Sequence, residues 1–204
     1  MNSLTISKRM FSRGQSGKSV VIVAAKRTPV GSFMGQFKNM PAPMLASAAA
    51  RGAIEQSGLQ TTDIEESYFG AVITAGMGQA PDRQVMLEAG CSVDTPSTLV
   101  NKVCASGMKS VMMAAQQIRV GDRDICLAGG MENMSKIPHL MYLRQPTGYG
   151  HASMIDAIQY DGLTDVYNNI LMGSCVEKNV SELGISREAQ DEYAIMSYTR
   201  AREA

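Results

Sequence analysis

One cysteine has neighbours suited to nucleophilic chemistry. Cys104 lies in the segment NKVCASGMK, between an apolar stretch and a stretch with helical periodicity. Before the first turn of a helix, N–H groups without partners and the positive end of the helix dipole favour a thiolate over a thiol. The small residues Ala105, Ser106 and Gly107 would let a carbonyl approach backbone N–H groups that stabilise a tetrahedral oxyanion. These residues predict a nucleophile and leave one alternative open, a small buried apolar cysteine.

The remaining cysteines and the histidines carry weaker signals. Cys91, Cys126 and Cys175 are far apart and form no C-x-x-C pair, which argues against a zinc site and a redox dithiol. We expect reduced packing residues there and no redox cofactor. His139 and His151 fall in an irregular stretch, where a solvated loop histidine is favoured over a catalytic base.

Composition narrows the class of protein. The 204 residues suffice for one domain, or for one domain and part of another. Lys+Arg and Asp+Glu balance at 19 each, so we expect no nucleic-acid or membrane-surface partner. Hydrophobic residues make up 45%, and no apolar run approaches the ~20 residues that span a bilayer. The composition therefore predicts a soluble globular protein.

The first 18 residues, MNSLTISKRMFSRGQSGK, are basic and serine-rich and contain no acid. That composition predicts a mitochondrial transit peptide, and hence a location in the matrix. A disordered basic tail is the alternative, because a short stretch of this kind also arises by chance.

Strand-length apolar runs alternate with helical patterns in the following part of the chain. The predicted strands are residues 19–25, 68–74, 98–103 and 124–128. The predicted helices are residues 44–56, 81–89 and 107–120, each followed by a glycine. The alternation predicts an α/β fold with a mostly parallel sheet between helices, in which ligands gather at the carboxyl ends of strands. Cys104 follows such an end.

The periodicity changes after Gly130. Residues 131–162 are rich in Met, Pro, Gly and Tyr and are too long for a plain loop, so we expect a functional excursion. Residues 174–177 (SCVE) predict a capping box for a helix that Gly184 ends. Ser186 is predicted to cap a last helix. Because that helix reaches Ala204 without a stop signal, we expect the sequence to be cut off there.

The segment NKVCASGMK closely resembles the acylated-cysteine signature of the thiolase family. The resemblance continues through VVIVAAKRTPVGSF, GQAPDRQ, LAGGMENMS, DGLTDVYN and EAQDEYAIMSYTRA. It covers nearly everything after the leader and is strongest to the mitochondrial thiolases that act on acetoacetyl-CoA. It implies a thiolase N-terminal domain over residues 19–136. Residues 137–204 would be part of an inserted loop domain for coenzyme A binding and oligomer contacts, and the C-terminal half would be absent.

The resemblance also implies a reaction. Family members work by a ping-pong mechanism, in which the cysteine takes an acetyl group from acetyl-CoA and a second acetyl-CoA attacks it to form acetoacetyl-CoA. Cys104 would be that cysteine, in a homo-oligomer that is a tetramer in the family. The acid–base histidine and second cysteine of the family stand in G-H-P and C-x-G contexts, which do not occur here. The alternative is a truncated, inactive paralogue that binds CoA or a full-length subunit. A ketoacyl-synthase-type condensing enzyme is disfavoured by the AGGMENMS and DGLTDVYN segments.

Three positions near the end carry further expectations from the resemblance. Tyr198 matches a tyrosine that lies beside CoA and contributes to a potassium site, with a tyrosine that packs its own helix as the alternative. Met172 falls in a segment that is usually H-M-G and lies close to CoA. Here Leu171 replaces the histidine, which removes a polar group from that site.

Overall fold

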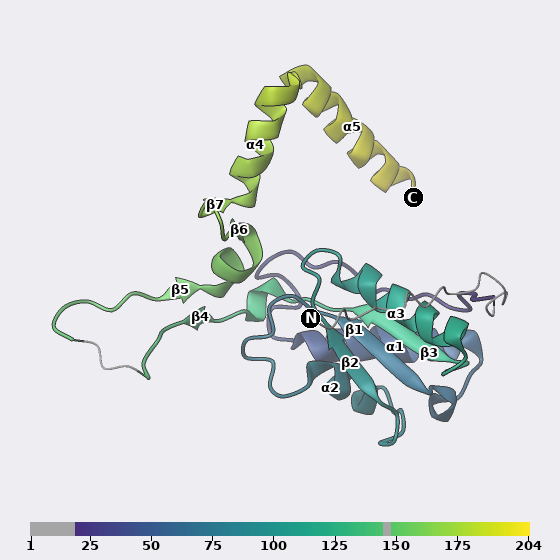
Figure 1. Cartoon of the computed structure of the whole chain (residues 1–204). Helices are drawn as coiled ribbons and strands as arrows, with labels where there is room; N and C mark the ends of the chain where they lie inside the picture. Colours follow the sequence, from purple (N-terminus) through teal and green to yellow (C-terminus); the bar gives the residue numbers. More distant parts are fainter. Residues whose placement is uncertain (1–18, 145–147) are drawn as a thin grey trace, which may run out of the picture. The chain divides into compact units, whose positions relative to one another are not determined.

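The computed structural model describes residues 19–144 and 148–204, so the predicted leader lies outside the described residues. By its internal contacts the chain forms two compact units, the first ending at Lys136 and the second beginning at Ile137. The helices and strands of both are labelled in Figure 1.

The first unit is built on a three-stranded parallel sheet in the order β2-β1-β3. Its strands are β1 (Glu66–Gly70), β2 (Ser97–Val100) and β3 (Cys126–Gly130). Its helices are α1 (Ala42–Ser57), α2 (Pro81–Glu88) and α3 (Ser106–Val120), with short 3-10 turns at Thr61–Asp63 and Met134–Lys136. The predicted α/β fold with a parallel sheet is therefore confirmed.

Helices cover both faces of this sheet. Figure 1 shows α3 on one face and α1 and α2 on the other. The larger core lies on the α1/α2 face and includes Phe69 of β1 and Val85 and Met86 of α2. On the other face, Tyr68 of β1 packs with Ala114 of α3. Successive residues of β1 thus point to opposite layers, as strand geometry requires.

The helix stop signals were predicted well. Gly58 and Gly121 follow α1 and α3 in the left-handed conformation, with φ of 73° and 86°, which only glycine adopts without strain. The buried stripe of α1 consists of Ala42, Ala46, Ala50 and Ile54, and the neighbouring row that starts at Leu45 is half-buried.

The predicted strand at residues 19–25 is wrong. These residues belong to no strand, and Val21, Ile22 and Val23 are 66–80% exposed. A strand needs a hydrogen-bonded neighbour, and β3 pairs only with β1, so its other edge has no partner among the described residues. The valine-rich sequence supplies the propensity for a strand without supplying the partner.

The strand predicted at residues 98–103 ends early, at Val100. The chain turns sharply after it, because Val103 has a φ of 51°, which no strand allows. Of the other two strands, β1 begins two residues before the predicted start and ends four residues before the predicted end, and β3 lies two residues later than predicted.

The second unit holds short strands and two helices. Two antiparallel pairs form, β4 (His139–Leu140) with β5 (Ile155–Asp156) and β6 (Thr164–Asp165) with β7 (Ile170–Leu171), with a π-helical turn at Ile158–Leu163. The helices are α4 (Met172–Leu183) and α5 (Arg187–Glu203), and neither contains a buried residue.

Two helix starts in this unit were predicted with different success. Ser186 caps α5 as expected, with its hydroxyl accepting the Ala189 N–H at 3.2 Å. The capping box at residues 174–177 is wrong, because α4 already begins at Met172 and Ser174 lies inside its first turn. Across the described residues, no helix has the length and apolar character to cross a membrane.

Candidate active site

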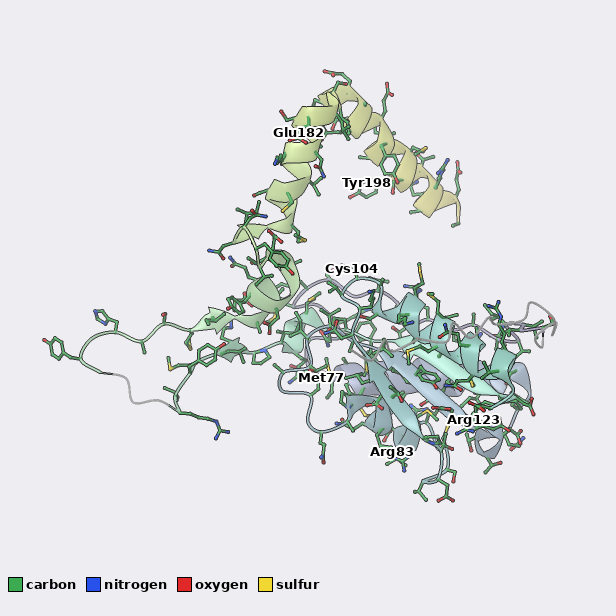
Figure 2. The ribbon with its side chains drawn as sticks, viewed as in Figure 1. Met77, Arg83, Cys104, Arg123, Glu182 and Tyr198 are labelled. Atoms are coloured by element: carbon green, nitrogen blue, oxygen red, sulfur yellow. The ribbon has the colours of Figure 1, made fainter. Side chains whose placement is uncertain are left out.

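Cys104 lies between β2 and α3, at the carboxyl end of the parallel sheet. It directly precedes Ala105, the N-cap of α3, and its side chain is exposed. Figure 2 labels it on the loop that leads into this helix. The predicted position between strand and helix is therefore correct, and the thiol is reachable from solvent. In this fold such a position is where ligands gather.

The turn that presents Cys104 is strained and tightly hydrogen-bonded. Val103 is β-branched and has a φ of 51°, a conformation that costs about 1–3 kcal/mol and persists only where its surroundings enforce it. Ser106 is buried, and its hydroxyl accepts the Lys102 N–H at 2.8 Å and donates to the Val103 carbonyl at 2.6 Å. Asn101 Oδ1 accepts the Val103 N–H at 2.9 Å. The backbone on both sides of Val103 is thereby fixed.

Close packing brings the start of α3 onto the sheet. A Cβ on Gly70, the last residue of β1, would lie 2.5 Å from the Ser106 carbonyl carbon and 2.6 Å from the Gly107 nitrogen. One turn later, the Ser110 hydroxyl donates to the carbonyls of Gly107 and Gly129, at 2.6 and 2.7 Å. Helix and sheet are thus in backbone contact beside Cys104, which only a glycine at position 70 permits.

Two polar residues that the sequence did not single out complete this end of the sheet. Asn101 Nδ2 donates to the Val72 carbonyl at 3.0 Å, while Glu132 accepts the N–H groups of Val72 and Ile73 at 2.9 and 3.4 Å. Burial raises the pKa of the Glu132 carboxyl, and those two N–H groups oppose the shift. Both residues fall within segments that resemble the family, but nothing in the sequence pattern indicates their partners.

A hollow of about 590 Å³ opens beside α3 in the first unit. Residues 26–33 line it, together with residues that include Gly129, Met131 and Glu132. Gly107 borders it, whereas Cys104 does not line it. The hollow therefore reaches the first turn of α3 without enclosing the thiol.

The other cysteines differ from Cys104 in environment. Cys91 is buried, and burial raises the pKa of its thiol. Burial, followed by the nearby carboxylates of Glu66 and Glu65, raises the pKa of Cys126 to about 11. Cys175 lies half-buried in the first turn of α4. Of the four free thiols, Cys104 is the exposed one.

The predicted cofactor residues lie in the second unit. Tyr198 is 78% exposed on α5, where Figure 2 labels it. Met172 is the first residue of α4, and Leu171 is its N-cap, which provides no side-chain hydrogen bond.

The histidines of the second unit lie on its surface. His139 is exposed, with Nε2 4.0 Å from Asp156 Oδ2, and His151 is exposed as well. A second hollow of about 380 Å³ in the same unit is lined by eight residues, among them Asp156, Asn169 and Leu171. Nowhere in the described residues do three or more His, Cys, Asp or Glu side chains gather as metal ligands would.

Comparison with known proteins gives one consistent family. The family model described as "Thiolase, N-terminal domain" matches residues 20–204. The mitochondrial acetyl-CoA acetyltransferase of Rattus norvegicus is 51% identical over 196 residues, which are 96% of this chain and 46% of the relative. Its Homo sapiens counterpart is 52% identical over 187 residues, covering 92% of this chain and 44% of the relative. The chain thus spans about half the length of the curated relatives it matches.

A solved structure agrees with the sequence comparisons. The Acat5 thiolase from Ascaris suum, crystallised in complex with coenzyme A, superposes with a TM-score of 0.87 at 38% identity. The superposition covers 90% of this chain and 48% of that one.

Proposed function

The chain belongs to the thiolase family, and on that premise we propose that it is the N-terminal part of an acetyl-CoA C-acetyltransferase whose acyl carrier is Cys104. One observation carries the proposal. Cys104 is the exposed thiol of the chain, and it sits on a strained turn at the start of α3, where the backbone holds it at the carboxyl end of the sheet.

The proposed chemistry has two halves. The Cys104 thiolate attacks the carbonyl carbon of acetyl-CoA, and collapse of the tetrahedral oxyanion breaks the bond to CoA sulfur, which leaves acetyl-Cys104 and CoA. The carbanion of a second acetyl-CoA, formed by loss of an α-proton to a base, then attacks that thioester. The new carbon–carbon bond gives acetoacetyl-CoA, and the bond to Cys104 breaks to return the thiolate. Thiolysis of acetoacetyl-CoA is the same path in reverse.

Both halves require proton transfers. A base must take the Cys104 proton, and an acid must protonate the departing thiolate. The family resemblance assigns these steps to a histidine and a second cysteine in contexts that the 204 residues lack. We therefore expect activity where a polypeptide that carries those groups completes the site.

The second unit would hold the coenzyme. We assign Met172 and Tyr198 to the coenzyme A side of the site, and Tyr198 also to a potassium ion. What supports this is the family resemblance of their segments, together with the exposure of both side chains. Leu171 offers no donor or acceptor at the N-terminus of α4, so we expect weaker CoA binding than in a relative with histidine there.

We also propose a location and an assembly. We assign the protein to the mitochondrial matrix, because the similar acetyltransferases are named mitochondrial and the first 18 residues are basic and contain no acid. A homo-oligomer, tetrameric as in the family, is the expected assembly. Diffuse cytosolic fluorescence of a reporter fused behind residues 1–18 would argue against import.

A second function is favoured by one observation. Leu171 in place of the usual histidine fits a catalytically inactive paralogue that binds CoA or a full-length thiolase subunit. Mass measurement of the native protein, intact and after denaturation, separates the two. A complex with a full-length subunit and no acetyl transfer supports the paralogue, whereas a single denatured polypeptide about twice as heavy as this chain supports the enzyme.

The nucleophile is tested by acetylation. The native protein is incubated with isotopically labelled acetyl-CoA, digested, and the labelled peptide is mapped by mass spectrometry. We expect label on Cys104 and its loss in Cys104→Ala, with Cys175→Ala as the matched control that keeps it. Label on Cys91, Cys126 or Cys175 with none on Cys104 would overturn the assignment.

A further inference from the structure

The three parallel strands each deliver one residue to a single hydrogen-bonded chain at their carboxyl ends. Asn101 follows β2, Val72 follows β1, and Glu132 follows β3. Val72 is the link, because its carbonyl accepts the Asn101 amide at 3.0 Å and its N–H donates to Glu132 Oε2 at 2.9 Å. The two side chains therefore hold the backbone of Val72 at both ends, Glu132 at its N–H group and Asn101 at its carbonyl group.

This series of hydrogen bonds reaches the turn before Cys104. The second arm of Asn101, its Oδ1 atom, accepts the N–H of Val103, the residue held at a φ of 51°. An amide can bridge these two sites because one end accepts while the other donates. An aspartate at position 101 would keep the bond to Val103 and lose the bond to the Val72 carbonyl.

Glu132 also restrains the peptide between Val72 and Ile73, whose carbonyl accepts the Asn101 amide. Its second oxygen accepts the Ile73 N–H at 3.4 Å, so a single carboxylate fixes two consecutive N–H groups. Carboxylates that accept backbone N–H groups form strong, charge-assisted hydrogen bonds. Removing Glu132 frees the 72–73 segment, and with it the carbonyl on which Asn101 is anchored.

We propose that Asn101 and Glu132 are positioning residues for the nucleophile, Asn101 by holding the strained Val103 turn directly and Glu132 by anchoring the peptide to which Asn101 is tied. This inference rests on the proposed function of Cys104 as acyl carrier. Its content is separate, because it concerns how the thiol is held at the start of α3. Neither residue contacts the substrate in this assignment.

The test measures thiol reactivity without any acyl-CoA. The full chain is treated with iodoacetamide between pH 6 and pH 10, and the rates at Cys104 and Cys175 are read by mass spectrometry, with Cys175 as the internal reference. Asn101→Ala should lower the Cys104 rate near neutral pH by about two- to fivefold, the effect expected when a thiolate loses its place at a helix N-terminus. Asn179→Ala, an exposed asparagine on α4, is the matched control and should change neither rate.

A second residue separates positioning from simple stability. Glycine adopts a positive φ without strain, so Val103→Gly should reduce the need for the Asn101 bond. The Asn101→Ala effect on the Cys104 rate should therefore shrink in a Val103→Gly background. Glu132→Gln, which keeps one acceptor, should fall between the parent and Glu132→Ala. Protection of buried Cys91 in every variant checks that the fold is intact.

The outcomes are distinct. Unchanged Cys104 rates and pH profiles in Asn101→Ala and Glu132→Ala overturn the positioning role, even where Cys104 is still acetylated by acetyl-CoA. Equal loss in Asn101→Ala with and without Val103→Gly overturns it too, since the effect would then not pass through the turn. Slower alkylation in these variants, with no acetylation of Cys104 in the native protein that carries the acid–base groups, supports the positioning role and refutes the acyl-carrier function.

Discussion

Gly70→Ala tests whether the sheet sets the position of α3, the helix that begins beside Cys104. The added Cβ would lie 2.5 Å from the Ser106 carbonyl carbon and 2.6 Å from the Gly107 nitrogen. Both separations are about 1 Å shorter than an ordinary van der Waals contact. Both partners are backbone atoms, so no side-chain rotation relieves the clash, and β1 or the start of α3 must move. Overpacking of this kind costs about 1–3 kcal/mol.

The matched control is Gly107→Ala, on the other side of the same contact. A Cβ on Gly107 meets nothing within 4 Å, and alanine in a helix is more stable than glycine by up to about 1 kcal/mol. Thermal unfolding by circular dichroism should therefore give a lower Tm for Gly70→Ala, by about 2–8 °C for each kcal/mol, and an equal or higher Tm for Gly107→Ala. Alkylation of Cys104 should slow in Gly70→Ala because the turn moves with α3. A Gly70→Ala variant with parental Tm and parental Cys104 reactivity would refute this reasoning.

Three further predictions concern the rest of the chain. Burial raises the pKa of Cys126 to about 11 and, aided by Glu66, that of Tyr68 to about 12, so the folded state holds these protons where the unfolded chain has lost them. The free energy of unfolding should then fall as the pH rises above about 9, and it should fall less steeply in Cys126→Ala. Urea unfolding measured up to about pH 11 checks this, and a free energy of unfolding that does not change with pH over that range would contradict it. Ser186→Ala should destabilise α5 by about 1 kcal/mol because the helix loses its N-cap hydrogen bond. Amide hydrogen exchange in α5 should be faster in this variant and unchanged in the control Ser181→Ala, which lies in α4. Equal exchange in α5 in the two variants would contradict a stabilising role for the cap. The 204-residue chain alone should not thiolyse acetoacetyl-CoA, because the two missing acid–base groups contribute ~10²–10⁴-fold each; turnover that depends on Cys104 would disprove it.

The position of Cys104 could be predicted because every signal for it is local. An apolar run, small residues after the cysteine, and a helical pattern that stops at Gly121 lie within about two dozen residues. Helices α1, α2 and α3 were predicted to within two residues for the same reason, since their glycine and proline signals act on adjacent backbone. The parallel sheet followed from the alternation of strands and helices.

What failed depends on partners far away in the sequence. Residues 19–25 have the composition of a strand, but a strand is made by its neighbour, and the composition does not reveal whether one is present. Val103 is a poor residue for positive φ, so nothing in its type indicated that β2 would end at Val100. The partners of Asn101 are set by topology, because Val72 is 29 residues away and meets it only at the end of the sheet.

The strain at Val103 also explains why the missed residues gather where they do. Only four non-glycine residues in the described parts of the chain have positive φ, and Val103 is the β-branched one, where the penalty is greatest. Such a conformation persists only if its surroundings stabilise it, and here three bonds from Asn101 and Ser106 fix the peptides on either side. A glycine at 103 would need none of these bonds, but the turn would then sample other conformations. The valine, whose conformation is fixed by these bonds, restricts the backbone before Cys104 to one conformation, as the proposed attack of Cys104 on a carbonyl from a fixed direction requires.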